Sequence, residues 1–172
     1  YNFIFVHSES CSPNKIYFEI SKHMLKDTLL EFFDRDLNKL HQEISLYENE
    51  HQLWIVKESV SNSAGNLCLH LVGNLNHFIG ATLGKTGYVR EREKEFTLKN
   101  TPKTDLLNSI EETKKTVLKT LQNLSTAELE KDFPLEKHNK IVSTENMLVH
   151  LLGHLSYHLG QINYHRRILA TS

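Results

Sequence analysis

Histidine is the residue type whose number and spacing stand out in this chain of 172 residues, because 11 of them are histidines. The segment 143–169 holds four of these: His150, His154, His158 and His165. Its apolar residues recur with helical spacing, and a helix turns by about 100° per residue, so the four histidines fall within an arc of about 80°. Neutral imidazoles one turn apart on one helix face are a common way to bind a transition metal. The segment therefore predicts a metal-binding face beside its apolar stripe.

A site with three histidine ligands needs a further histidine from a second helix. The segment 63–83 has helical apolar spacing, with Asn62 or Ser63 as its N-cap. A polar line beside its apolar stripe contains Asn66, His70, Asn74 and His77. A hydrogen-bonded core histidine is the simpler interpretation of His70 taken alone. Set beside the C-terminal histidines, His70 or His77 becomes the candidate ligand from this helix.

The chemistry of such a site follows from its ligands. Three neutral histidines leave a divalent metal with its full charge and at least one open coordination position. That position can hold water and lower its pKa to about 7, or hold a substrate thiol as the thiolate. Zinc and nickel both accept imidazole ligands, and the sequence does not choose between them.

Other site chemistries fit the sequence less well. The H-E-x-x-H motif of zinc proteases is absent, and the segment 48–51 alone has the Glu-x-x-His spacing that a ferritin-like di-iron site needs twice. Cys68 lies about 160° around its helix from His70, which indicates a small core residue and not a catalytic thiol.

Four long helices are expected to position these residues, which predicts an all-α fold. The first helix runs from about Tyr17 or Met24 to Tyr47, the second covers 63–83, the third begins at Thr104, and the fourth begins at Ser143 or Thr144. Ser125 and Glu128 have the spacing of a capping box. Residues 1–23 are expected to be an N-terminal tail or extension, and residues 24–172 a single domain.

The connection 84–103 is long and charged, and it can run the length of a helix bundle. Arg90 and Arg92 within it are interpreted mainly as solvated loop residues, with contact to an anionic substrate as the alternative.

Composition excludes several classes of partner. The net charge is -1 with no basic block, so nucleic acid is not expected as a partner. No apolar run approaches the roughly 20 residues that span a bilayer, so no membrane insertion is expected. The two cysteines form no C-x-x-C motif and suggest no disulfide framework, which favours a cytoplasmic protein.

The histidine-bearing segments resemble those of the DinB/YfiT-like superfamily. Residues 154–162, H-L-S-Y-H-L-G-Q-I, fit the pattern H-x-x-x-H-x-G-Q-[IL] on the last helix. Residues 70–74, H-L-V-G-N, look like the H-L-x-G-N signature of one subgroup on the second helix. The following N-H-F-I-G…G-Y-V-R-x-R-x-x-E-F also resembles that subgroup. The resemblance covers about residues 24–169.

The resemblance implies an up-down-down-up four-helix bundle, often a homodimer, with one divalent metal ion held by His70, His154 and His158. Asn74, His150 and Gln161 are then expected to orient the ligands or the substrate. The chain departs from the minimal pattern by adding His77, His150 and His165, which are expected as supporting residues or as replacement ligands.

Members of the superfamily include bacillithiol S-transferases and mycothiol-dependent isomerases, and others are described as metal-dependent hydrolases. We therefore expect a metal-dependent enzyme of the thiol S-transferase type, acting on a small-molecule thiol and an electrophile. Hydrolysis by a metal-bound hydroxide is the enzymatic alternative. A non-catalytic, metal-stabilised binding module or dimer is the alternative outside enzymes.

Overall fold

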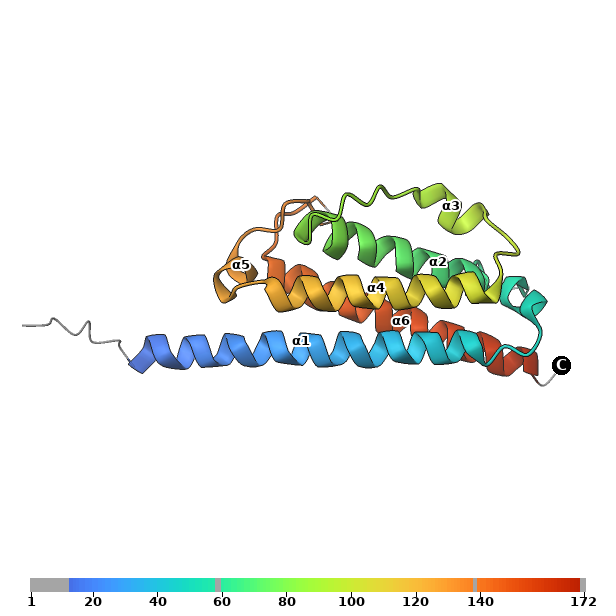
Figure 1. Ribbon diagram of the computed structural model, residues 1–172, viewed down its shortest axis with the longest axis horizontal. Helices are drawn as coiled ribbons and strands as arrows, with labels where there is room; N and C mark the ends of the chain where they lie inside the picture. The colour runs from blue at the N-terminus through green and yellow to red at the C-terminus, as the bar shows by residue number, and fades with distance from the viewer. Residues whose placement is uncertain (1–12, 58–59, 138, 171–172) are drawn as a thin grey trace, which may run out of the picture.

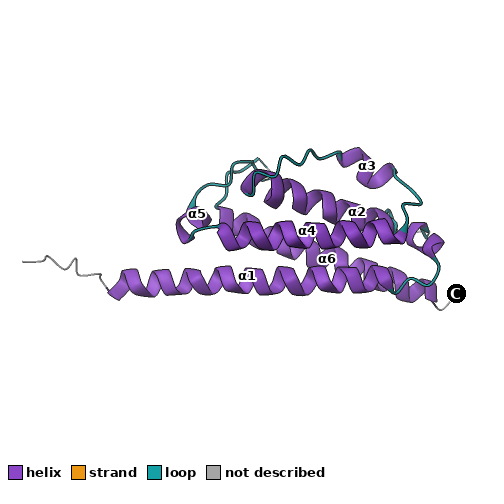
Figure 2. Cartoon of the chain, viewed as in Figure 1, coloured by secondary structure: helices purple, strands orange, loops and turns teal. Residues whose placement is uncertain are grey.

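The computed structural model describes residues 13–57, 60–137 and 139–170, with side chains from Met24 onward. All regular elements in this part of the chain are helical, as predicted, and no strand forms there (Figure 2). The helices are α1 (Pro13–Ser45), η1 (Glu50–Trp54), α2 (Ala64–Leu75), η2 (Asn76–Leu83), α3 (Arg92–Thr97), α4 (Lys103–Asn123), α5 (Thr126–Glu130) and α6 (Thr144–Ala170). None of the described helices is both long enough and apolar enough to cross a membrane.

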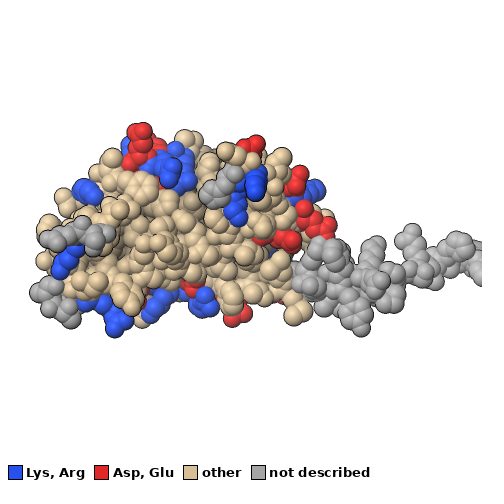
Figure 3. Space-filling model, turned by 180° about the vertical axis from the view of Figure 1, so that it is seen from behind, with Lys and Arg blue, Asp and Glu red and all other residues tan. Residues whose placement is uncertain are grey.

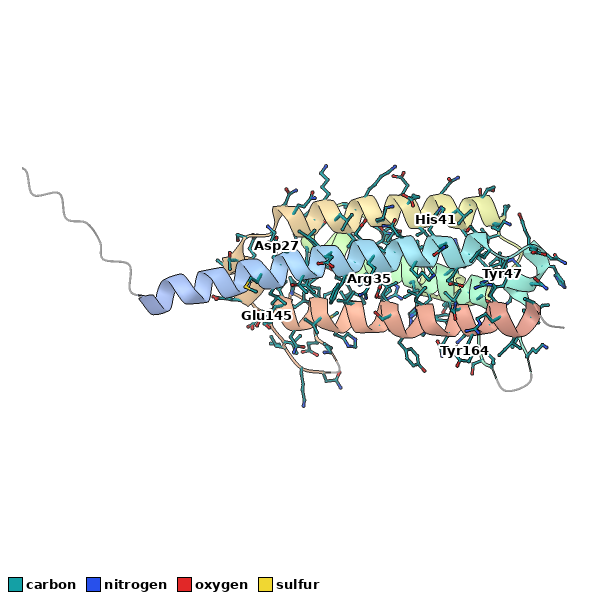
Figure 4. All side chains as sticks on the ribbon, turned by 90° about the horizontal axis from the view of Figure 1, so that it is seen from below. Asp27, Arg35, His41, Tyr47, Glu145 and Tyr164 are labelled. Atoms are coloured by element: carbon teal, nitrogen blue, oxygen red, sulfur yellow. The ribbon has the colours of Figure 1, made fainter. Side chains whose placement is uncertain are left out.

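The four longest elements, α1, α4, α6 and α2 with its continuation η2, lie side by side (Figure 1). Seen from below, α1 lies between α4 and α6 and contacts both (Figure 4). Apolar side chains of α1 recur at three- and four-residue steps and are buried between the helices: Leu29, Phe33, Leu37, Leu40 and Ile44. This pattern is the one that predicted the helix from sequence.

Contacts between side chains show how the helices run relative to one another. Residue numbers increase together in the contacts between α1 and α6, Asp36 with Ser156 and Glu43 with Asn163, so these helices are parallel. The contact of Tyr47, two residues after α1, with His165 continues this order. Residue numbers also increase together in the contacts between η2, with the Gly84 that follows it, and α4: Asn76 with Thr113, Gly80 with Thr116, and Gly84 with Thr120. In the contacts between α1 and α4, residue numbers increase along α1 while they decrease along α4, so these two helices are antiparallel: Lys26 with the Gln122 carbonyl, and Asn38 with Lys114.

Several predicted helix boundaries are confirmed. The Ser63 hydroxyl accepts a hydrogen bond from the Asn66 amide and caps α2. Ser125 and Glu128 form the predicted capping box of α5. The helix α6 begins at Thr144, and the Ser143 hydroxyl accepts a hydrogen bond from the Asn146 backbone amide.

Three features differ from the sequence-based expectation. The helix α1 begins at Pro13, inside the segment 1–23 that we expected as a tail, and residues 1–12 lie outside the described residues. The second helix changes from α to π geometry at Asn76 and stays π-helical to Leu83. The charged connection 84–103 contains the short helix α3, which lies over α2 (Figure 1).

Two helical glycines provide a matched test of this packing. A side chain at Gly65 would lie 2.7 Å from the buried Trp54 ring, whereas nothing lies within 4 Å of a side chain at Gly153 in α6. We expect Gly65→Ala to lower the free energy of unfolding by about 1–3 kcal/mol through overpacking. Gly153→Ala should raise it by about 0.5–1 kcal/mol, because alanine favours a helix interior over glycine. Urea unfolding measures both, and equal effects of the two substitutions would contradict the packing of Trp54 on Gly65.

Candidate metal centre

Three histidines from two helices converge on one point. His70 comes from α2, and His154 and His158 lie one turn apart on the facing side of α6. One ring nitrogen of each lies within 4.8 Å of the other two. The His154 Nε2 atom is 3.2 Å from His70 Nε2 and 3.0 Å from His158 Nε2. Nitrogen ligands of a tetrahedral zinc ion, each about 2.0–2.1 Å from the metal, are about 3.3 Å apart. The three rings are thus close enough together to hold a metal ion.

Hydrogen bonds at the outer edge of two rings fix their tautomers. His70 Nδ1 lies 2.9 Å from the Glu95 carboxylate, and His158 Nδ1 lies 2.6 Å from the side-chain carbonyl oxygen of Gln161. Both partners are acceptors, so each Nδ1 carries the proton and donates it. The Nε2 atoms of His70 and His158 are therefore unprotonated in the neutral rings, and their lone pairs face His154.

His154, at the centre, cannot satisfy both neighbours. A neutral imidazole carries a single proton, so His154 Nε2 can donate to at most one of the two facing nitrogens. Its Nδ1 atom is buried and has no hydrogen-bond partner among the described residues. Either tautomer leaves at least one buried ring nitrogen without a partner, which is costly. A cation between the three Nε2 atoms would satisfy all three of these lone pairs, with the His154 proton then on Nδ1, so the donor set fits a divalent metal.

The electrostatic environment keeps the rings of His154 and His70 neutral. Burial is the main reason that the pKa of His154 falls to about 4, and the neighbouring rings of His158 and His70 lower it further. Burial also lowers the pKa of His70, although its hydrogen bond to Glu95 opposes this. At neutral pH a proton therefore does not compete for the His154 lone pair, which favours metal binding.

Glu95 is the important residue that the sequence analysis missed. It lies on α3, is 6% exposed, and forms a bidentate ion pair with Arg90, with N···O distances of 2.6 and 2.8 Å. Burial alone raises the pKa of Glu95, but the hydrogen bonds and charges of Arg90 and His70 outweigh burial and lower the pKa below its ordinary value. Glu95 is thus ionised at neutral pH and holds the His70 ring.

The backbone of α2 leaves space for this carboxylate. A side chain at Gly73 would collide with the Glu95 carboxyl group, so the missing Cβ allows α3 to approach α2 closely. The next residue, Phe96, places its ring 5.1 Å from the His70 ring. Our interpretation of Arg90 as a solvated loop residue was wrong, because its guanidinium is largely buried against Glu95. The R-x-R-x-x-E-F pattern at residues 90–96 was the available signal.

The other predicted supporting residues lie at different distances from the triad. Gln161 contacts His158 directly, as described above. Asn74, one turn beyond His70 on α2, is buried, and its Oδ1 atom has no partner among the described residues. His150 lies one turn before His154, with ring centres 6.5 Å apart, and is not part of the triad.

The remaining candidate ligands are used elsewhere. His165 Nδ1 is 2.7 Å from the Tyr47 hydroxyl, and its Nε2 donates to the Ile55 carbonyl at 2.9 Å, so this ring links α6 to the segments that follow α1 and η1. His77, on η2, packs against the ring of Phe78. Cys68 is fully buried, and burial raises the pKa of its thiol to about 12, so a core role is confirmed.

Two pockets of different character meet at the triad. The first, which we call the basic pocket, has a volume of about 380 Å³, and its lining includes His70, His154, Asn74, His150, Arg92 and Lys137. The second, which we call the tyrosine pocket, has a volume of about 490 Å³, and its lining includes His158, Gln161, Tyr157, Tyr164, Leu67 and Ile168. Tyr164 lies at the outer side of α6 (Figure 4). The triad is therefore reachable from two separate pockets.

The contact between Glu95 and His70 predicts a specific effect on metal affinity. Replacing Glu95 by Gln keeps the shape but removes the charge that orients and polarises His70, and loss of such a partner typically weakens metal binding 10–100-fold. Competition of zinc against a chromophoric chelator measures this affinity. Glu93→Gln is the matched control, because Glu93 lies exposed on the same helix, and it should leave affinity unchanged. Equal affinities of the two variants would contradict the role of Glu95.

Comparison with known proteins gives a family but no activity. No curated protein matches the chain. The family model described as "Protein of unknown function (DUF1572)" matches residues 19–172, which is most of the chain and contains the triad, Glu95 and both pockets. The chain therefore belongs to the DUF1572 family.

Proposed function

We propose that the chain is an up-down-down-up four-helix bundle of the DinB/YfiT-like class that binds one divalent metal ion, zinc or nickel, through His70, His154 and His158. We propose further that it is an enzyme of the thiol S-transferase type. The observation that carries the proposal is the convergence of three Nε2 atoms, two of them with lone pairs fixed toward the third by Glu95 and Gln161.

Each residue of the centre has a defined task in this proposal. A divalent ion on three neutral ligands retains its charge and an open position, and it would lower the pKa of a bound thiol. Glu95 and Gln161 hold the rings of His70 and His158 in the ligating tautomer, and Arg90 holds Glu95. His154 stays neutral at physiological pH because burial lowers its pKa. Asn74 and His150 line the adjacent basic pocket, where they would contact a substrate.

Two pockets at one triad favour transfer between two substrates. His70 and His154 border the basic pocket, whereas His158 borders the tyrosine pocket, whose wall offers apolar and aromatic contacts to an electrophile. In the transfer step a sulfur–carbon bond forms while the carbon–halogen bond of a chlorinated acceptor breaks. The thiol proton goes to solvent and the chloride leaves. A purely structural metal would be enclosed, so the access from both pockets speaks against a non-catalytic binding module.

Hydrolysis by a metal-bound hydroxide is the second candidate. It is favoured by His150, a titratable ring 6.5 Å from the His154 ring and on the wall of the basic pocket. A hydrolase needs a base for an attacking water, and His150 is a candidate for that role.

A homodimer and a cytoplasmic location also belong to this proposal. The side of the molecule opposite to that of Figure 1 is mostly uncharged, with charged residues gathered toward its edges (Figure 3). Large exposed side chains on α6 include Tyr157, Tyr164 and Ile168. A surface of this kind supports self-association. The free thiol of the buried Cys68 fits a reducing compartment.

The transferase proposal is tested with zinc- and nickel-loaded protein, a panel of small thiols and an aryl chloride acceptor. Mass spectrometry measures the rate of thioether formation. We expect this rate to exceed the rate in buffer with the same metal by at least about tenfold. Gln161→Ala should lower this rate because it releases His158, whereas Gln122→Ala, at an exposed position of α4, should not. The absence of any rate above buffer with all thiols would contradict transfer. Cleavage of ester or amide substrates would then favour hydrolysis.

A further inference from the structure

The basic pocket contains a polar group that metal binding does not use. Asn74 is only 8% exposed and lines this pocket, and its Oδ1 atom has no hydrogen-bond partner among the described residues. Leaving a buried acceptor unpaired costs about 1–3 kcal/mol. The amide lies one helical turn from His70, so a molecule that reaches the triad through this pocket passes beside it. Oδ1 is therefore placed to accept a hydrogen bond from a hydroxyl or amine of that molecule.

Cationic side chains border the same pocket. Arg92 and Lys137 come from two separate segments that meet there, the start of α3 and the loop before α6. Arg92 makes no ion pair within the described ranges, and Lys137 contacts a neutral partner, the Asn146 side chain, at 3.2 Å. Glu136 is the acidic residue in the lining, and the Arg90 charge is already paired with Glu95. The remaining charge of the lining is positive.

The tyrosine pocket differs in this respect. Among its described lining residues, Lys57 is the one that carries a full charge, and most of the others are apolar or tyrosine. The cationic groups are thus concentrated on the side of the triad that His70 and His154 face. The two substrates of a transfer reaction would therefore be distinguished by charge as well as by shape.

We propose that the basic pocket binds an anionic group of the thiol substrate. Arg92 and Lys137 contact a carboxylate of this substrate, and Asn74 accepts a hydrogen bond from one of its hydroxyl or amine groups. The substrate class is then a small, carboxylate-bearing thiol, whose sulfur reaches the triad while its acidic end stays near the pocket mouth. A volume of about 380 Å³ lies in the range of small-molecule sites. This inference rests on the proposed thiol function.

Titration calorimetry on the zinc-loaded protein tests the proposal with three probes, and metal content is checked after each titration. Mercaptosuccinate has a thiol and two carboxylates, 2-mercaptoethanol has a thiol and no carboxylate, and succinate has no thiol. We expect mercaptosuccinate to bind at least about tenfold more tightly than 2-mercaptoethanol. Arg92→Ala and Lys137→Ala should each lower the affinity for mercaptosuccinate about tenfold, as expected for loss of one charged hydrogen bond. The affinity for 2-mercaptoethanol should change by less than about twofold. Arg92→Lys should retain most of the affinity.

The control is Arg167→Ala, which removes an exposed cation from α6 outside the lining of either pocket. It should leave the affinity for all three probes unchanged. Equal affinity for both thiols, unaffected by Arg92→Ala, would overturn the anionic subsite and leave the thiol function intact. If succinate binds as tightly as mercaptosuccinate in an Arg92-dependent way and 2-mercaptoethanol does not bind, the subsite stands and the thiol function fails. If no probe binds, both are overturned.

Discussion

The nitrogen lone pairs of His70 and His158 both point at the same atom, Nε2 of His154, from 3.2 and 3.0 Å. Unprotonated nitrogens repel one another at such distances unless a proton or a metal ion lies between them. Their arrangement is imposed from outside, because Glu95 and Gln161 hold the protons of His70 and His158 on the opposite ring atoms. The neutral state of His154, which follows from its burial, leaves a metal ion as the fitting cation.

The bundle keeps α2 and α6 in the register that this centre requires. A slip of one residue would rotate a helix by about 100° and carry a ligand away from the others. The register of α6 is set against α1 by Glu43, a buried carboxylate that binds both Asn163 and Arg166. The register of α2 and η2 is set against α4 by close contacts of Gly80 and Gly84 with threonines. Charged and small residues far from the triad thereby determine its geometry.

Local patterns in the sequence predict the helices and the histidine face well, because helical periodicity depends on nearest neighbours along one chain segment. The caps at Ser63 and Ser125 are predictable for the same reason. Glu95 is different. It lies 25 positions from His70 in a polar segment, where helical spacing does not distinguish it from the neighbouring acidic residues, and the R-x-R-x-x-E-F pattern marks it without showing that it becomes buried. Periodicity also does not separate His70 from His77, since that choice depends on how α2 faces α6. The resemblance to the DinB/YfiT-like superfamily predicted His70 as the ligand. It did not predict the partner of His165, which is the Tyr47 hydroxyl.

The central claim is that His70, His154 and His158 together hold one metal ion per chain. Elemental mass spectrometry on wild type, His70→Ala and His154→Ala, each purified and reconstituted with zinc or nickel, tests it most directly, with melting temperatures to verify folding. His51→Ala, at an exposed position in η1, is the control. The account predicts one ion per chain in wild type and in the control, and none in the two triad variants although they remain folded. Metal-free wild type after reconstitution, or full metal content in the triad variants, would contradict it.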